Sequence, residues 1–557
     1  MLVLSKLDLY KNKDGMLNGI IRILADAGFL QYCYMLIKGK PGKMSAGVTK
    51  ETLDGITSEL FFKVAEELKT GRFQFNRRDI ISKPTPRTDW MCEYTPVLCG
   101  GSGKKEGRPS HFPQHFILDS VGGKWGGVGS PREKIVHKGL QVVLEAIYEP
   151  KFLNSSHGFR PNRSTLSALR LLYLKAPHYT WVIKGEISKC FDRIPHSVIM
   201  ELIKKDIKCD RTLSLIKQAL TVGYLDPKTK QITKAKVGTP QGSVLSPLLA
   251  NIVLHELDKY LNEIIIPEFY RGRRRITNPT YNTLAYLRHP RNTFASIKDK
   301  EDALKQMRSV SIMDAKYPGY RRSMYIRYAD DFIYLLEGPI TEARQIKEKI
   351  KTFLWEKLGL ELNDEKTVIA HIGEGFHFLG AYIKSLRHVD LRMKTRTVKG
   401  TPITLRANVR ASVNMSTKLL IEKLIKGKFA RRNKLGQLLA NPVTSMVNLD
   451  HTTILQFFNS KIHGLLNSYS FAGNRIENNN LILILRLSLA KTLARKYKLR
   501  SARQAFKKFG PYLKDPSTDL MLYVPKSLPT IHKYNTSAVS SPLSLDQFER
   551  KRKSKKI

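Results

Sequence analysis

The sequence is poor in acidic residues relative to basic ones, and this imbalance makes the chain strongly basic. It has 48 acidic residues against 95 lysines and arginines in a chain of 557, a formal net charge of +47. So basic a chain indicates a polyanionic partner. Nucleic acid is the first candidate, and an anionic membrane surface is the second.

Cysteine is also scarce, which excludes a disulfide framework. The five cysteines are odd in number and scattered along the first part of the chain, at Cys33, Cys92, Cys99, Cys190 and Cys209. They predict a protein of a reducing compartment. Cys92 and Cys99 do not have the spacing of a zinc knuckle, and no cysteine follows Cys209, which argues against a cysteine-ligated zinc module in the C-terminal half.

Long apolar runs are missing as well. No stretch approaches the ~20 apolar residues of a membrane span, and the most apolar one, 481–485, is interrupted by Arg486. The first residues, MLVLSKLDLYKNKDG, reach acidic residues too early for a secretory signal and are not typical of an Arg/Ser-rich transit peptide. We therefore expect no membrane partner, and a hydrophobic content of 42% predicts a mostly folded chain.

The stretch Tyr328-Ala329-Asp330-Asp331 carries the strongest chemical signal. It lies in SMYIRYADDFIYLLEG (323–338), where aromatic and branched residues flank two carboxylates on both sides. This pattern predicts two β-strands that meet at a tight acidic turn. Adjacent aspartates at a hairpin tip repel each other, and a divalent cation would relieve that repulsion. A solvated acidic turn is the alternative.

Three further segments accompany the hairpin. VIKGEISKCFDRIPH (182–196) places Glu186 on a strand and Phe191 five positions later. GTPQGSVLSPLLANIVLHELD (238–258) opens a helix with a turn that lets the backbone approach a nucleotide or template base. LGLELNDEKTVIA (358–370) places Lys366 after a helix. In this order the segments resemble the palm of a reverse transcriptase.

Other blocks resemble proteins encoded by group II introns. IYEPKF (147–152), SHGFRPNRST (156–165) and FHFLG (376–380) are similar to block signatures of that family. KPGKMSAGVTKETLDGI (40–56) resembles its additional N-terminal block. NSYSFAGN (467–474) and SLAKTLARKYKLRSARQAFKKFG (488–510) resemble domain X, the maturase thumb.

The resemblance implies an α/β fold, with right-hand polymerase-like fingers and a palm built on an antiparallel sheet, followed by an all-α thumb. We expect an N-terminal extension and fingers at 1–165, with an irregular Gly- and Pro-rich insertion at 85–130. The reverse-transcriptase palm would occupy 166–385, the helical thumb or domain X 386–513, and a basic tail 514–557. The segment 270–320 is polar, basic and poorly periodic, and predicts no regular element.

The resemblance also implies roles for single residues. Glu186, Asp330 and Asp331 would be the catalytic carboxylates that bind Mg²⁺. Lys366 would approach the triphosphate or protonate the leaving pyrophosphate. Phe191 would exclude a ribose 2′-hydroxyl by filling the space beside C2′. The alternatives are an exposed surface lysine at Lys366 and an ordinary core aromatic at Phe191.

Four further residues would bind template or substrate. Gln241 and Gly242 would contact the template–nucleotide pair. Arg160 would contact the template backbone or a neighbouring carboxylate, with a structural ion pair as the alternative. Lys83 would clamp the incoming triphosphate, although the sequence does not distinguish it from Arg78 or Lys124.

The chain departs from the family pattern in three places. The family has aspartate where this chain has Glu186, and the extra methylene moves the carboxylate by ~1 Å, a displacement that can cost on the order of 10²-fold in rate. Asp192 lies on the wrong side of the strand alternation to substitute for it. The insertion at 85–130 replaces most of the basic fingers hairpin. No HNH endonuclease motif follows domain X, so we expect no DNA-target cleavage.

Three functions are compatible with these features. The leading one is a group II intron maturase that binds structured intron RNA and promotes its splicing, with attenuated Mg²⁺-dependent DNA synthesis. The second is a fully active RNA-directed DNA polymerase that uses an RNA template, a DNA primer and dNTPs. The third is a retron-type reverse transcriptase. The sequence is also compatible with a homodimer. The lysine-, isoleucine- and asparagine-rich composition favours a mitochondrial protein, with a bacterial cytoplasmic one as the alternative.

Overall fold

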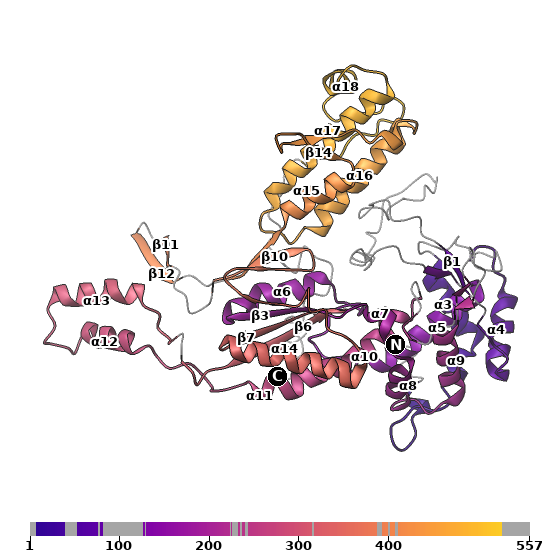
Figure 1. The fold of residues 1–557 in the computed structure, drawn as a ribbon, viewed down its shortest axis with the longest axis horizontal. Coiled ribbons are helices and arrows are strands. Elements are labelled where there is room, and N and C mark those ends of the chain that lie inside the picture. Colours follow the sequence, from indigo (N-terminus) through magenta and orange to yellow (C-terminus); the bar gives the residue numbers. More distant parts are fainter. Residues whose placement is uncertain are drawn as a thin grey trace.

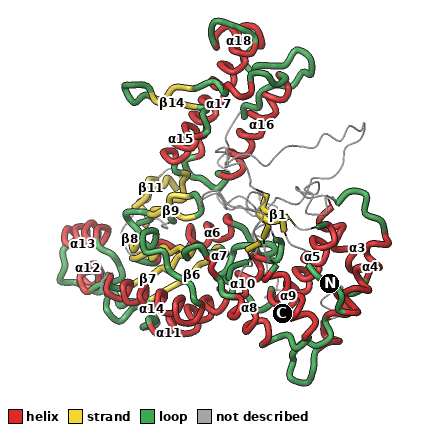
Figure 2. Tube along the Cα trace, turned by 45° about the vertical axis from the view of Figure 1, so that its right-hand side comes forward, coloured by secondary structure: helices red, strands yellow, loops and turns green. Residues whose placement is uncertain are grey.

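The computed structural model describes most of the chain and is shown in Figures 1 and 2. The described residues are 7–38, 53–75, 78–81, 126–128, 130–222, 224–225, 232–233, 237–239, 243–314, 317–386, 393–398, 401–406 and 410–525. None of the helices in this part of the chain combines the length and the apolarity needed to cross a bilayer.

A four-stranded antiparallel sheet forms the centre of the molecule, in the order β6-β7-β3-β8. Its strands are β6 (Arg322–Tyr328), β7 (Asp331–Glu337), β3 (Trp181–Glu186) and β8 (Val368–His371). Successive residues of β7 alternate between two cores: Phe332 and Tyr334 face one, whereas Ile333 and Leu335 face the other. Because both faces are covered, the strand is an almost uninterrupted hydrophobic run.

Different elements cover the two faces of the sheet (Figure 1). On the first face lie α10 (Ser246–Lys259), α11 (Ile266–Glu268) and α14 (Ile340–Leu358). On the second face lies α6 (Thr165–Lys175), followed by a small sheet of β9 (Phe376–Phe378), β10 (Ala381–Lys384) and β13 (Ser412–Met415). The antiparallel palm predicted from the sequence is confirmed.

The N-terminal part is mainly helical and shares the first core. It contains α2 (Ile21–Leu24), α3 (Ala27–Lys38), α4 (Ser58–Thr70), α5 (Pro131–Tyr148), α7 (Cys190–Arg193), α8 (His196–Lys204) and α9 (Asp210–Thr221). Helix α5 begins with a capping box in which Ser130 and Glu133 satisfy each other's backbone N–H groups. The described cysteines, Cys33, Cys190 and Cys209, are free and buried.

A second small sheet lies in this region, with the strand order β2-β1-β4-β5. Its strands are β1 (Arg78–Ile81), β2 (Gly126–Val128), β4 (Tyr224–Leu225) and β5 (Ile232–Thr233). The predicted irregular insertion at 85–130 therefore ends in a strand that pairs with β1, and the rest of it, at 85–125 and 129, lies outside the described residues.

The C-terminal part is a helical unit that rises from the second face of the sheet (Figure 1). It contains α15 (Thr417–Lys426), α16 (His451–Ser468), α17 (Asn478–Lys496) and α18 (Ala502–Phe509). The helical thumb is confirmed, with an addition that was not predicted: β14 (Ala430–Arg432) and β15 (Leu438–Ala440) form a short antiparallel hairpin between α15 and α16. A further hairpin, β11 (Met393–Val398) and β12 (Thr401–Arg406), precedes the thumb.

The segment 270–320 corrects the sequence interpretation, because it contains two helices. They are α12 (Pro279–Arg288) and α13 (Ile297–Ser309). They pack on each other around only three buried residues, Leu284, Ala303 and Met307. So small an apolar stripe explains why helical periodicity was not recognised in the sequence.

Candidate active site

The tight acidic turn predicted from the sequence joins two central strands. Strand β6 ends at Tyr328 and β7 begins at Asp331, and these two residues pair in register. Ala329, in the turn, has φ of 56°, which is uncommon for a residue other than glycine. The hairpin is therefore confirmed, and its tip holds Asp330 and Asp331.

Glu186 lies directly across from this tip. It is the last residue of β3 and pairs with Asp331 of β7. Residues that face each other across antiparallel strands have Cβ atoms about 4.5–5.5 Å apart, on the same face of the sheet. The backbone N–H of Ile187 also donates to the Asp330 carbonyl at 3.1 Å. The fold thus brings the three predicted carboxylates together at one end of the sheet.

The electrostatics of these carboxylates reflect their crowding. Burial, together with the charges of Asp330 and Glu186, raises the pKa of Asp331 to about 7. Burial also raises the pKa of Asp330, again with a contribution from Glu186. Each ionised carboxylate disfavours the ionisation of its neighbours, and a nearby cation would reverse this effect.

Lys366 supplies positive charge to the cluster. Its Nζ donates to Glu186 Oε1 at 2.6 Å, and this hydrogen bond raises the pKa of Lys366. The loop that carries the lysine is anchored to the same strand, because the N–H of Asn363 donates to the Glu186 carbonyl at 2.9 Å. The Lys366 N–H in turn donates to Asn363 Oδ1 at 3.3 Å. The structure therefore places Lys366 at the carboxylates, although its side chain is partly exposed.

The carboxylate cluster has the chemistry that a divalent cation requires. Carboxylate oxygens are the ligands that Mg²⁺ prefers, and Glu186, Asp330 and Asp331 supply them at one end of the sheet. Within the described residues, however, no three His, Cys, Asp or Glu side chains stand close enough to hold a metal ion as they are. The donor types fit, and their side chains would have to draw closer around an ion.

Phe191 is half-buried in the short helix α7 and is linked to the end of β6 through Phe159. Its ring meets the Phe159 ring edge-on with centroids 6.0 Å apart, and Phe159 in turn lies 6.5 Å from the Tyr328 ring. The N–H of Thr239 donates to the Phe191 carbonyl at 2.7 Å, which attaches the start of the Gly-Thr-Pro-Gln-Gly turn to this helix. Gln241 and Gly242, further along that turn, lie outside the described residues, as does Lys83.

Arg160 forms an ion pair with a neighbouring carboxylate, which was one of the two partners expected for it. It is 4% exposed, and its guanidinium donates to both oxygens of Glu149, with the closest contact at 2.8 Å. It also donates to the carbonyls of Leu153 at 2.6 Å and Ser156 at 3.0 Å. These contacts fit the structural ion pair that was the alternative for Arg160.

A buried arginine beneath the acidic turn was missed in the sequence. Arg327 is fully buried and donates to both oxygens of Asp258 on α10, at 2.7 and 2.6 Å. It also donates to Asn251 Oδ1 at 3.0 Å, to Ser156 Oγ at 2.9 Å and to the Ala329 carbonyl at 3.0 Å. One side chain therefore joins α10, the 156–165 block and the turn. The signal was present, since Arg327 stands among the apolar and aromatic residues 324–328.

The 156–165 block approaches the turn so closely that only glycine fits. A Cβ atom on Gly158 would lie 2.3 Å from the backbone nitrogen of Ala329. The block is held there because the His157 N–H donates to the Arg327 carbonyl and the Arg327 N–H donates to the Ser155 carbonyl, both at 2.8 Å. The Asn251 side chain donates to the Gly158 carbonyl at 2.9 Å. These contacts fix the position of the aspartate pair.

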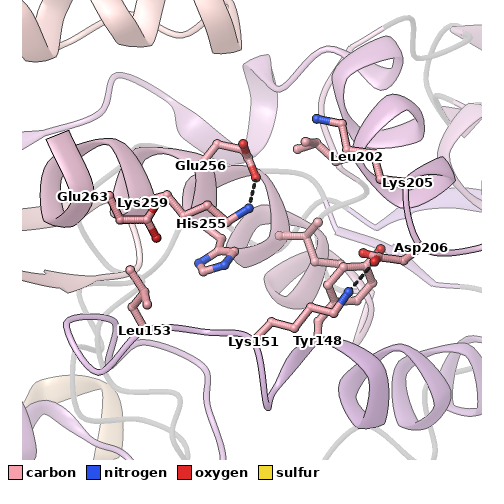
Figure 3. A pocket seen from close by; sticks show the side chains of 11 residues that line it. Tyr148, Lys151, Leu153, Leu202, Lys205, Asp206, His255, Glu256, Lys259 and Glu263 are labelled. Atoms are coloured by element: carbon pink, nitrogen blue, oxygen red, sulfur yellow. Dashed lines mark hydrogen bonds and ion pairs between the residues drawn. The ribbon is translucent and has the colours of Figure 1, made fainter. Parts of the chain in front are cut away.

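A separate cavity of about 290 Å³ lies between α5, α8 and α10 (Figure 3). It contains an ion pair between Lys151 and Asp206 and another between Lys259 and Glu256 at 2.8 Å. Burial lowers the pKa of His255 in its wall to about 4, so this ring is neutral near pH 7. The charges in this cavity largely compensate one another, and none of the predicted site residues lines it.

Two family models match consecutive parts of the chain. A model described as reverse transcriptase (RNA-dependent DNA polymerase) matches residues 127–383. A model described as type II intron maturase matches residues 408–554. The first range contains the carboxylate cluster, and the second contains the helices α15 to α18.

Three curated relatives of the chain are also named as intron proteins or as an intron maturase. A putative COX1/OXI3 intron 2 protein of Saccharomyces cerevisiae is 32% identical over 501 residues, 89% of this chain and 54% of that protein. The group II intron-encoded protein LtrA of Lactococcus lactis is 29% identical over 511 residues, 88% of this chain and 76% of that protein. Nuclear intron maturase 2, mitochondrial, of Arabidopsis thaliana is 26% identical over 424 residues, 68% of this chain and 54% of that protein.

The chain spans about half the length of the yeast relative. Among solved structures, apo telomerase from Candida tropicalis aligns with 70% of this chain and 57% of that chain at 13% identity, with a TM-score of 0.34, which is too low to bear on the fold.

Proposed function

We propose a function that starts from the family of the chain, which belongs to the group II intron maturases that carry a reverse transcriptase domain. In this proposal the chain binds structured intron RNA and holds it in the splicing-competent shape. The observation that carries this proposal is the reverse transcriptase domain at 127–383 followed in the same chain by the intron maturase domain at 408–554. The net charge of +47 supports it, because a basic surface can contact many phosphates of a folded RNA.

The test of this proposal is a splicing assay with the host intron RNA. We expect the natural chain to increase the fraction of spliced product at a low Mg²⁺ concentration, where the RNA alone folds poorly. A variant in which Asp330 is replaced by alanine should promote splicing as well as the natural chain, since the RNA supplies the splicing chemistry in this family. Equal splicing with and without the protein would refute the proposal.

RNA-directed DNA synthesis is the second activity that the site supports. Glu186, Asp330 and Asp331 would hold Mg²⁺, which when bound supplies charge neutralisation for nucleotidyl transfer from a dNTP to a DNA primer on an RNA template. Lys366 would approach the triphosphate or donate a proton to the leaving pyrophosphate. Phe191 would exclude a ribose 2′-hydroxyl, Gln241 and Gly242 would contact the template–nucleotide pair, and Lys83 would clamp the triphosphate.

The glutamate at 186 attenuates this synthesis in our proposal. Its longer side chain reaches the Lys366 ammonium at 2.6 Å, and that contact competes with both the cation and the triphosphate. Replacing Glu186 by aspartate should increase primer extension on an RNA template, whereas Asp330→Ala should abolish it. If the natural chain extends primers well and Glu186→Asp changes nothing, the glutamate is not a limitation.

We propose an organellar, mitochondrial location. The relative from Arabidopsis thaliana is named as mitochondrial, although the relative from Lactococcus lactis keeps a bacterial location open. Fractionation of the source cells, with an antibody to the thumb, distinguishes the two.

A further inference from the structure

The helices α12 and α13 form an arm that stands apart from the palm, at the left of Figure 1. The chain leaves the palm at Arg271 and returns at Arg321, and these two residues pair through their backbones. Above them, the Asn278 N–H donates to the Ile312 carbonyl at 2.8 Å and the Asp314 N–H to the Ile276 carbonyl at 3.0 Å. The outgoing and returning segments are therefore bonded to each other, and the arm has a defined neck.

The loop at the tip of the arm is ordered by its own hydrogen bonds. Asn292 is buried, and its N–H donates to the His289 carbonyl at 2.9 Å. Its Oδ1 accepts from the Phe294 N–H at 3.1 Å. Ser296 and Asp299 then begin α13 with a capping box. The tip consequently has a fixed shape, and its side chains are presented in set positions.

This ordered tip exposes aromatic rings to solvent. Phe294 is 98% exposed, and Tyr286, on the last turn of α12, is 70% exposed. A phenylalanine ring that an ordered loop exposes to water does not stabilise the folded state, because the hydrophobic effect favours its burial. Such rings are typical of a binding surface. Ile297 is the neighbouring apolar side chain, at 80% exposure.

Positive charge surrounds these rings. Arg288, Arg291 and Lys298 flank them in the sequence and are exposed, and within the described residues no ion pair joins them to an acid. The described residues from 270 to 322 include nine arginines and three lysines against four acidic residues. At the root, Arg322 packs over the rings of Tyr270 and Tyr320, at 3.9 and 4.2 Å from their centroids. Arginine and aromatic residues therefore lie together at the root of the arm as well as near its tip.

We propose that this arm is a docking element for unpaired RNA. Exposed bases would stack on Phe294 and Tyr286, while Arg288, Arg291 and Lys298 would contact the adjoining phosphates. Base–aromatic stacking stabilises binding by about 1–3 kcal/mol per base, and proteins recognise RNA mostly through unpaired loops whose bases can stack. A protein partner fits less well, because three exposed cations, Arg288, Arg291 and Lys298, flank the few apolar side chains at the tip.

This inference rests on the proposed function only in taking RNA as the partner. A photo-crosslinking experiment tests it directly, with the full chain and a 4-thiouridine-labelled RNA hairpin whose loop is unpaired. We expect crosslinked peptides from 286–298 with the hairpin loop, and none when the same bases are placed in a continuous duplex. Crosslinks that occur in the thumb but never in the arm would overturn the inference and leave the proposed function intact.

A pair of variants gives a second, quantitative readout. Replacing Tyr286 and Phe294 by leucine keeps apolar volume but removes the stacking faces. We expect on the order of a 10-fold loss of affinity for the hairpin loop and an unchanged affinity for the duplex, measured by fluorescence anisotropy. Trp355→Leu on α14 is the matched control, since Trp355 is an aromatic residue 62% exposed outside the arm, and it should change neither affinity.

The remaining outcomes also decide the matter. Equal affinity of the double variant and the natural chain for the loop would refute the arm as an RNA-binding element. A changed sedimentation coefficient without any change in RNA affinity would refute it in favour of an interface between copies of the chain. Failure of the natural chain to bind either RNA would count against the proposed function itself.

Discussion

At the scale of single residues, the carboxylate cluster shows how much the sequence could reveal. The alternation of apolar residues around the two aspartates predicted a hairpin, and its tip has been found where it was expected. The contact between Glu186 and Lys366 could not be predicted, because it depends on how a loop 180 residues further along folds back on β3. Only the register of β3 on β7 brings these groups together.

The first prediction concerns the raised pKa of Asp331. An unfolded aspartate ionises near pH 4, whereas Asp331 in the folded chain ionises near pH 7. Between these values the folded state binds the extra proton, so the free energy of unfolding should fall as pH rises from about 4 to about 7. Asp331→Asn should remove this part of the pH dependence.

Thermal unfolding at several pH values, with EDTA present, measures the effect. The natural chain and Asp331→Asn should converge in Tm toward pH 4, and the natural chain should be the less stable of the two at pH 7.5. Parallel curves for the two proteins would show that Asp331 ionises at its ordinary pKa.

The second prediction concerns Arg327, whose partner Asp258 is also fully buried. Arg327→Met would leave the Asp258 carboxylate without a counter-charge, and breaking a buried ion pair costs about 3–5 kcal/mol. Chemical denaturation should report a loss of that size. Lys349→Met, which removes an exposed ion pair with Glu268, is the control and should cost at most about 1 kcal/mol.

At the scale of elements, the 156–165 block explains why the acidic turn is held so firmly. The sequence identified this block only through resemblance, and no periodicity pointed to its contact with the turn. Its two irregular backbone positions, Phe159 with φ of 55° and Asn162 with φ of 61°, belong to a loop whose path is set by contacts distant in sequence. Local propensity carries no information on such contacts.

The third prediction tests that contact. Gly158→Ala introduces a Cβ atom against the backbone of Ala329, and because backbone cannot rotate away, the turn must shift. We expect primer extension to fall on the order of 10-fold or more, with a loss of stability of about 1–3 kcal/mol.

A matched substitution in the thumb separates this clash from a general effect of alanine. Gly464 lies within α16 and has open space where a Cβ would be, so Gly464→Ala should leave extension unchanged and stabilise the helix by about 0.5–1 kcal/mol. Equal effects of the two substitutions on extension would disprove a specific role for Gly158.

The elements that the sequence did not predict share a physical cause. Helices α12 and α13 bury few residues, and the strands β14 and β15 have three residues each, so neither leaves a clear periodic signal. Longer and better-buried elements, such as the strands β3, β6 and β7, were predicted because burial imposes a regular apolar pattern. Sequence periodicity thus reports burial more faithfully than it reports secondary structure.

At the scale of the whole molecule, the charge of +47 is the dominant property. The fourth prediction follows from it: affinity for intron RNA should decrease steeply with salt, on the order of 10³-fold between about 50 and 200 mM, because binding releases many counter-ions. Filter binding at several salt concentrations measures the slope. A flat response would contradict an interface made mainly of phosphate contacts.

The palm and the thumb also share one apolar core. Ile333 and Leu335 of β7 belong to the same buried cluster as residues of α16 and α17. If the chain were divided near residue 385, each fragment would expose the apolar surface that the other now covers. We therefore expect the two fragments to be insoluble when they are produced apart and to associate into a soluble complex when they are produced together. The reverse transcriptase and maturase parts, although matched by separate family models, would then form one folding unit.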